Sequence, residues 1–77
     1  MKIQRCDGIR EAYRNNEYVL FNTYTYEKII LKNTACEIWK QVSDEKVISY
    51  NKNNIDKNTE RIVLFLYKKG YISISDI

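Results

Sequence analysis

The chain lacks histidine and proline, and only two of its 77 residues are glycine. Histidine is the commonest general base and the commonest nitrogen ligand for zinc, so most acid–base and zinc chemistry is excluded. The two cysteines, Cys6 and Cys36, lie far apart without a second pair of ligands, and neither a phosphate loop nor a nucleophile elbow is present. We therefore expect a binding protein with no metal, no cofactor and no catalysis of its own.

Long apolar runs are also missing. No segment approaches the roughly 20 apolar residues of a membrane span, and the opening stretch MKIQRCDGIR has no signal-peptide core. Two cysteines are too few for a disulfide framework, so we expect a cytoplasmic protein with free thiols and no membrane partner. The net charge of +3 is too small to select a partner by itself.

What is present is 44% hydrophobic residues, enough for one small core. We expect a single domain over residues 1–77, with loose ends at 1–8 and 73–77. Asparagine tolerates left-handed backbone angles, so Asn15-Asn16 and Asn22-Thr23 predict two short turns. These turns join three strands rich in β-formers into an antiparallel meander: Gly8 to Arg14, Glu17 to Asn22, and Tyr24 or Tyr26 to Leu31.

The hydrophobic period then changes to that of a helix. Apolar side chains at i, i+3, i+4 and i+7 predict a first helix whose core stripe is Ala35, Ile38, Trp39 and Val42. Asn33 or Thr34 is expected to cap it, with Glu37 completing a capping box. A weaker helix is expected from Glu45 to Lys52. A third helix, Thr59 to Lys69, follows a cap at Asp56 or Asn58 and ends at Gly70.

The third predicted helix has more apolar surface than its core stripe uses. Phe65 lies beside Arg61 and Lys69, and Leu64 lies beside Lys68. Apolar residues bracketed by cations suggest a wall that meets an anionic, partly hydrophobic ligand. Ordinary packing with a solvated basic end, which also suits the helix dipole, explains the pattern equally well.

Three stretches carry a family resemblance: YVLFN in the second strand, LKNTACEIW (Leu31 to Trp39) and RIVLFLYKKGYI (Arg61 to Ile72). In order and separation they resemble the PqqD-like family. The resemblance implies an α+β, winged-helix-like fold in which a three-stranded antiparallel sheet is followed by three helices. It also implies a recognition element for ribosomally made, post-translationally modified peptides (RiPPs). Such an element binds the leader segment of the precursor peptide and delivers it to a separate modifying enzyme or leader peptidase.

In that family the leader adds as an extra strand to the third strand, against the third helix. The edge of a meander offers unpaired backbone groups, and an added peptide satisfies them while alternate side chains give selectivity. By period two, Ile29 and Leu31 face the core. Arg61 and Lys68 would pair with leader carboxylates, whereas Trp39 belongs to the core stripe. The candidate peptide-binding residues are Lys28, Ile29, Ile30, Leu31, Arg61, Leu64, Phe65 and Lys68.

Two other functions fit the same pattern of elements. A DNA-binding winged helix would need base-reading residues, but the middle of the third predicted helix is Val63, Leu64, Phe65 and Leu66, so we expect no nucleic-acid partner. A scaffold that docks only on a partner enzyme would use the same sheet edge. The exposed edge also permits self-pairing, so a homodimer stays possible.

Overall fold

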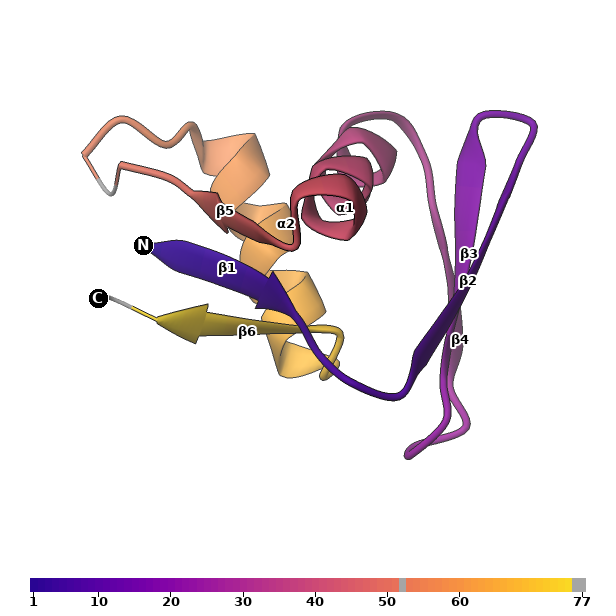
Figure 1. Ribbon diagram of the computed structural model, residues 1–77. Helices are drawn as coiled ribbons and strands as arrows, with labels where there is room; N and C mark the ends of the chain where they lie inside the picture. Colours follow the sequence, from indigo (N-terminus) through magenta and orange to yellow (C-terminus); the bar gives the residue numbers. More distant parts are fainter. Residues whose placement is uncertain (52, 76–77) are drawn as a thin grey trace.

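Four strands, a helix, a strand, a second helix and a last strand follow one another in a computed structural model that describes residues 1–51 and 53–75 (Figure 1). The elements are β1 (Lys2–Arg5), β2 (Ile9–Arg14), β3 (Glu17–Asn22), β4 (Lys28–Leu31), α1 (Asn33–Glu45), β5 (Val47–Ser49), α2 (Lys57–Lys68) and β6 (Ile72–Ser75). The strands form two antiparallel sheets, which we call the meander sheet (β2-β3-β4) and the second sheet (β5-β1-β6). α1 lies between them and contacts strands of both.

The expectation of one three-stranded sheet followed by three helices is wrong. Instead of a helix from Glu45 to Lys52, α1 continues to Glu45 and ends as Lys46 takes a positive φ of 69°. Val47–Ser49 then pairs antiparallel with β1. The apolar Val-Ile pair suits a half-buried strand, and pairing with a distant segment overrides the weak local helical pattern. Lys52 lies outside the described residues.

The predicted loose ends are also wrong where the structure describes them. Residues 2–5 pair with residues 72–75 in the register Lys2↔Ser75 to Arg5↔Ile72. Ile3 and Ile72 on these strands are buried, so pairing and burial together order both segments. Residues 76–77 of the predicted tail lie outside the described part of the chain.

The meander itself is present as one of the two sheets. Asn15 and Asn16 take φ values of 54° and 63°, the left-handed geometry expected of the turn between β2 and β3. The second turn is longer than expected, because β4 begins at Lys28 rather than at Tyr24 or Tyr26. The Asn22 side chain organises this turn by accepting hydrogen bonds from the backbone N–H groups of Tyr24 and Thr25.

Helix ends follow the predicted chemistry at α2 but not at α1. The Asp56 carboxylate accepts hydrogen bonds from the Thr59 backbone N–H at 2.8 Å and the Thr59 hydroxyl at 3.0 Å. Gly70, at φ 82°, ends α2 in a Schellman motif in which the Tyr71 N–H donates to the Leu66 carbonyl. At α1, Lys32 occupies the N-cap position without a side-chain hydrogen bond, so the predicted capping box does not form.

The Asp56 cap makes part of the stability pH-dependent. Hydrogen bonds from Thr59 lower the pKa of Asp56 below its usual value. A depressed carboxyl pKa contributes stability that is present above the unfolded-state pKa and is lost as the pH falls through the folded-state value. We expect Asp56→Ala to lower the Tm at neutral pH and to converge on the parent protein in acid. Asp56→Asn, which keeps an acceptor, is the control. Equal Tm differences for Asp56→Ala at both pH values would contradict this role.

The core lies between the two sheets and the helices. Trp39 from α1, Tyr71 after α2, Leu20 from β3 and Ile3 from β1 have no exposed surface. The predicted core position of Trp39 is thereby confirmed. α1 contacts strands of both sheets and also α2, so it joins the meander sheet, the second sheet and α2 in one core.

Candidate functional site

β4 is an edge strand of the meander sheet and, within residues 1–51 and 53–75, pairs only with β3. The Asn22 N–H donates to the Glu27 carbonyl at 2.9 Å, and this bond sets the hydrogen-bonding phase of the ladder. Hydrogen-bonded and non-bonded pairs alternate along an antiparallel ladder, so the pairs Leu20↔Ile29 and Tyr18↔Leu31 are the bonded ones. Lys28 and Ile30 therefore direct their backbone N–H and C=O groups away from β3, toward the free edge.

Side chains along β4 alternate as the sequence indicated. Leu31 is buried and Ile29 packs against the core, whereas Lys28 is exposed and the Ile30 side chain is 53% exposed. The backbone of Ile30 thus faces the edge, and its side chain faces away from α1. A peptide added along β4 would meet the backbone of Lys28 and Ile30.

The residues that follow α2 contact the turn that precedes β4. The Lys69 ammonium lies 3.4 Å from a Glu27 carboxylate oxygen, and the buried Tyr71 hydroxyl donates to the Glu27 carbonyl at 3.1 Å. Burial, with the Glu27 charge as a second cause, raises the pKa of Tyr71, so its hydroxyl stays protonated as a donor. The Asn22 amide also donates to the Lys69 carbonyl at 3.4 Å. These bonds join the segment after α2 to the turn between β3 and β4.

The four predicted helix residues do not lie on one flank of α2. At about 100° per residue, Phe65 lies about 40° from Lys69 around the helix, whereas Leu64 lies about 140° away. Leu64 instead lines an apolar hollow of about 220 Å³ with Met1, Ile55, Glu60 and Val63. Arg61 and Lys68 are exposed on the side of α2 opposite its buried stripe. Of the four, Phe65 lies nearest to Lys69 around the helix, and Lys69 pairs with Glu27 in the turn before β4.

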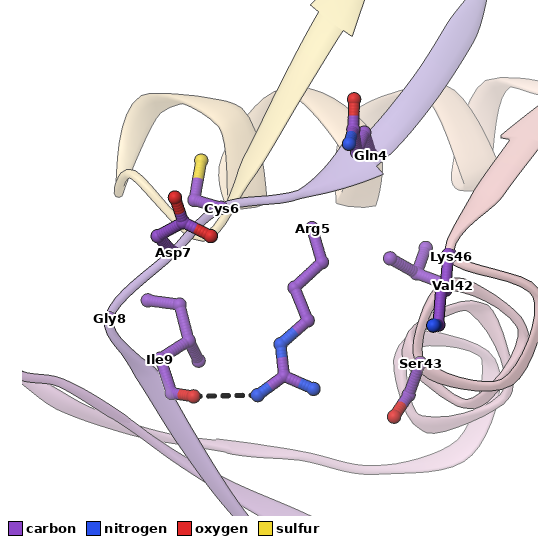
Figure 2. Close-up of a pocket in the computed structure, with 9 residues that line it drawn as sticks. All are labelled: Gln4, Arg5, Cys6, Asp7, Gly8, Ile9, Val42, Ser43 and Lys46. Carbon is purple, nitrogen blue, oxygen red and sulfur yellow. Dashed lines mark hydrogen bonds between the residues drawn. The ribbon is translucent and has the colours of Figure 1, made fainter.

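The other edge of the meander sheet is partly occupied. By the same alternation, Ile9 and Glu11 direct backbone groups away from β3, but the Arg5 guanidinium donates to the Ile9 carbonyl at 2.6 Å. Figure 2 shows the Arg5 side chain extending across a hollow of about 360 Å³ toward Ile9. β4 is therefore the more accessible edge of this sheet.

Sequence reasoning missed a polar cluster around Arg5, beside this hollow. Arg5 forms an ion pair with Glu11, and its guanidinium lies 5.6 Å from the centre of the Trp39 ring. The Glu11 carboxylate also accepts from the Trp39 indole N–H at 2.7 Å and from the Ser43 hydroxyl at 2.9 Å. Arg5 lay in a segment expected to be loose, so no local pattern pointed to this cluster. Because these side chains pair with one another, the cluster joins β1, β2 and α1 and has a structural role.

The hollow beside this cluster is also lined by a cysteine, Cys6, which is a poor nucleophile here. Burial, with a smaller contribution from the charge of Asp7, raises the pKa of the Cys6 thiol that lines the same hollow. A raised pKa keeps the thiol protonated at neutral pH and lowers its reactivity. Within the described residues, no group of three or more histidine, cysteine or carboxylate side chains is arranged to hold a metal ion.

Comparisons with protein-family models, with curated proteins and with solved structures returned no match to this chain. Across the described residues, neither helix has the length and apolarity needed to cross a membrane. The candidate site is therefore defined by geometry alone: the outward backbone of Lys28 and Ile30 on β4, with Phe65 on the flank of α2 that lies nearest to Lys69.

Proposed function

We propose that this protein binds an extended peptide, which adds to the meander sheet as a new strand along β4. The observation that carries the proposal is the edge position of β4, with the backbone of Lys28 and Ile30 facing away from β3. Such groups give affinity for any extended chain. Phe65 is 45% exposed on the flank of α2 nearest to Lys69, and we expect it to supply an apolar contact to the added peptide.

The source of the peptide follows from the resemblance of the sequence to the PqqD-like family. On that basis the ligand is the leader segment of a ribosomally made precursor peptide, and a separate modifying enzyme or leader peptidase receives it. In this role the protein binds the leader and catalyses no reaction itself. The mutual pairing of the Arg5–Glu11–Trp39 cluster and the protonated Cys6 thiol are compatible with a binding role.

The test is a titration of a synthetic leader, taken from a short precursor reading frame beside the gene, into ¹⁵N-labelled protein. We expect the largest amide shifts at Lys28 to Leu31 and at Phe65, with smaller ones around Glu27 and Lys69. Shifts confined to the second sheet would place the peptide elsewhere. A flat titration of folded protein would reject leader binding.

The two exposed apolar residues of α2 make a matched pair for a second prediction. Phe65 and Leu64 are each 45% exposed but lie on different flanks of the helix. We expect Phe65→Ala to weaken peptide binding about 5- to 10-fold, because about 1 kcal/mol of apolar contact is lost. Leu64→Ala should leave the affinity unchanged. Isothermal titration of both variants checks this, with melting curves to compare their stability. Equal losses of affinity would show that Phe65 has no special position.

A further inference from the structure

The face of the meander sheet turned away from α1, here called the outer face, carries an ordered pattern of side chains. Cross-strand pairing places three rows on it. The middle row is apolar, and a row containing cations lies on each side of it. The rows are Arg10–Phe21–Lys28, Ala12–Val19–Ile30 and Arg14–Glu17–Lys32.

The outer face is uncovered in the described part of the chain. Ala12 and Ile30 are exposed, and Val19 and Phe21 are partly exposed, although all four are apolar. Figure 1 shows this sheet nearly edge-on, with α1 on its inner side. An apolar row that is at least partly exposed, on a sheet whose opposite face is packed, is where a partner could bury further apolar surface.

The outer face has an excess of basic over acidic side chains. It holds four of the thirteen basic side chains and one of the ten acidic ones, Glu17, which lies 3.3 Å from Lys32. The remaining residues carry nine charges of each sign, so the outer face accounts for the whole formal net charge of +3. An acidic partner would therefore be complementary to this face. A second copy of the same face would bring like charges together.

We propose that the outer face docks an amphipathic helix of another protein, with an apolar stripe flanked on both sides by aspartate and glutamate. Alternate residues of a strand are about 7 Å apart, and a helix with its side chains is about 10–12 Å across. A helix lying across the strands along Ala12–Val19–Ile30 would therefore have Arg10 and Lys28 on one side and Arg14 and Lys32 on the other. The proposal that the outer face binds such a helix rests on the pairing, exposure and charge of its side chains. Identifying the helix as part of the enzyme that receives the peptide rests on the proposed function.

The test uses two synthetic helical peptides of about 18 residues with the same leucine stripe, one flanked by glutamate and one by lysine. We expect the glutamate peptide alone to shift the amides of Arg10, Ala12, Val19 and Ile30, with an affinity that falls as salt is added. Arg10→Glu should weaken binding about tenfold. Lys40→Glu, an equal charge change at an exposed position on α1, should have little effect.

Four results would overturn the proposal. Two are equal affinities for the two peptides, and equal losses of affinity in Arg10→Glu and Lys40→Glu. A third is a set of amide shifts at the same residues that depends on protein concentration without peptide, which would indicate self-association. The fourth is tighter binding of oligothymidylate or anionic phospholipid vesicles to this face than of the glutamate peptide. Failure here is separable from failure of the proposed function, because the leader titration reports on the β4 backbone and Phe65. A leader that binds while both helical peptides fail would remove only the outer-face proposal.

Discussion

Ile30→Pro is expected to remain folded and to lose peptide binding by about 10- to 100-fold, equivalent to about 1.4–2.8 kcal/mol. Proline has no backbone N–H, and Ile30 is one of the two β4 residues whose N–H faces the free edge. Proline is tolerated on an edge strand when the missing donor faces solvent. The sheet should therefore survive while the added strand loses its register. Circular dichroism and calorimetric titration measure the two effects separately.

Two neighbouring changes control this experiment. Ile30→Val keeps both the backbone donor and the branched side chain, so its affinity should match that of the parent protein. Ile29→Pro removes an N–H that faces β3, so it should lower the Tm because it breaks the ladder itself. Undiminished binding by folded Ile30→Pro would show that peptides do not add along β4.

Trp39→Ala is expected to cause the largest loss of stability, about 3–5 kcal/mol. Trp39 has no exposed surface and is the largest of the fully buried side chains. A domain of this length has a total stability of roughly 4–12 kcal/mol, so this loss is a large share of the total. The change also removes the indole that donates to Glu11 and lies against Arg5. Urea unfolding followed by far-ultraviolet circular dichroism measures the loss without needing the indole signal.

Trp39→Phe separates packing from hydrogen bonding at this position. It keeps an aromatic ring in the core but removes the N–H that donates to Glu11 at 2.7 Å. We expect a loss of stability smaller than that of Trp39→Ala, because the cavity is smaller. Glu11 would still pair with Arg5 and Ser43. A loss below about 1 kcal/mol for Trp39→Ala would contradict the core role of the indole.

Local chemistry predicted those parts of the fold whose partners are close in sequence. The Asn15-Asn16 turn, the Asp56 cap, the Gly70 helix end and the Trp39 stripe each follow from residues within one or two turns. β5 could not be predicted in this way. Its three residues form a strand because β1 supplies hydrogen bonds from more than forty positions away. A short apolar stretch read alone fits a helix or a strand.

In the candidate site, too, the local pattern predicted some features, whereas others depend on tertiary contacts. Period two correctly separated Ile29 and Leu31 from Lys28 and Ile30. Helical spacing could not show which flank of α2 lies nearest to the turn before β4, because that depends on contacts of Lys69 and Tyr71 with Glu27. Leu64 and Phe65 are adjacent in sequence and equally exposed. They differ only in their tertiary surroundings, because Leu64 lines the apolar hollow beside Met1 and Phe65 does not.

The pairing of β1 with β6 has a consequence for the order of folding. It joins residues at opposite ends of the described chain, from Lys2↔Ser75 to Arg5↔Ile72, whereas β2 and β3 meet across the two-residue Asn15-Asn16 turn. On length alone, closing the larger loop costs roughly 3 kcal/mol more entropy. We therefore expect the meander sheet to gain hydrogen-exchange protection before the second sheet during refolding. The unit that presents the β4 edge would then exist before the rest of the domain has closed around α2.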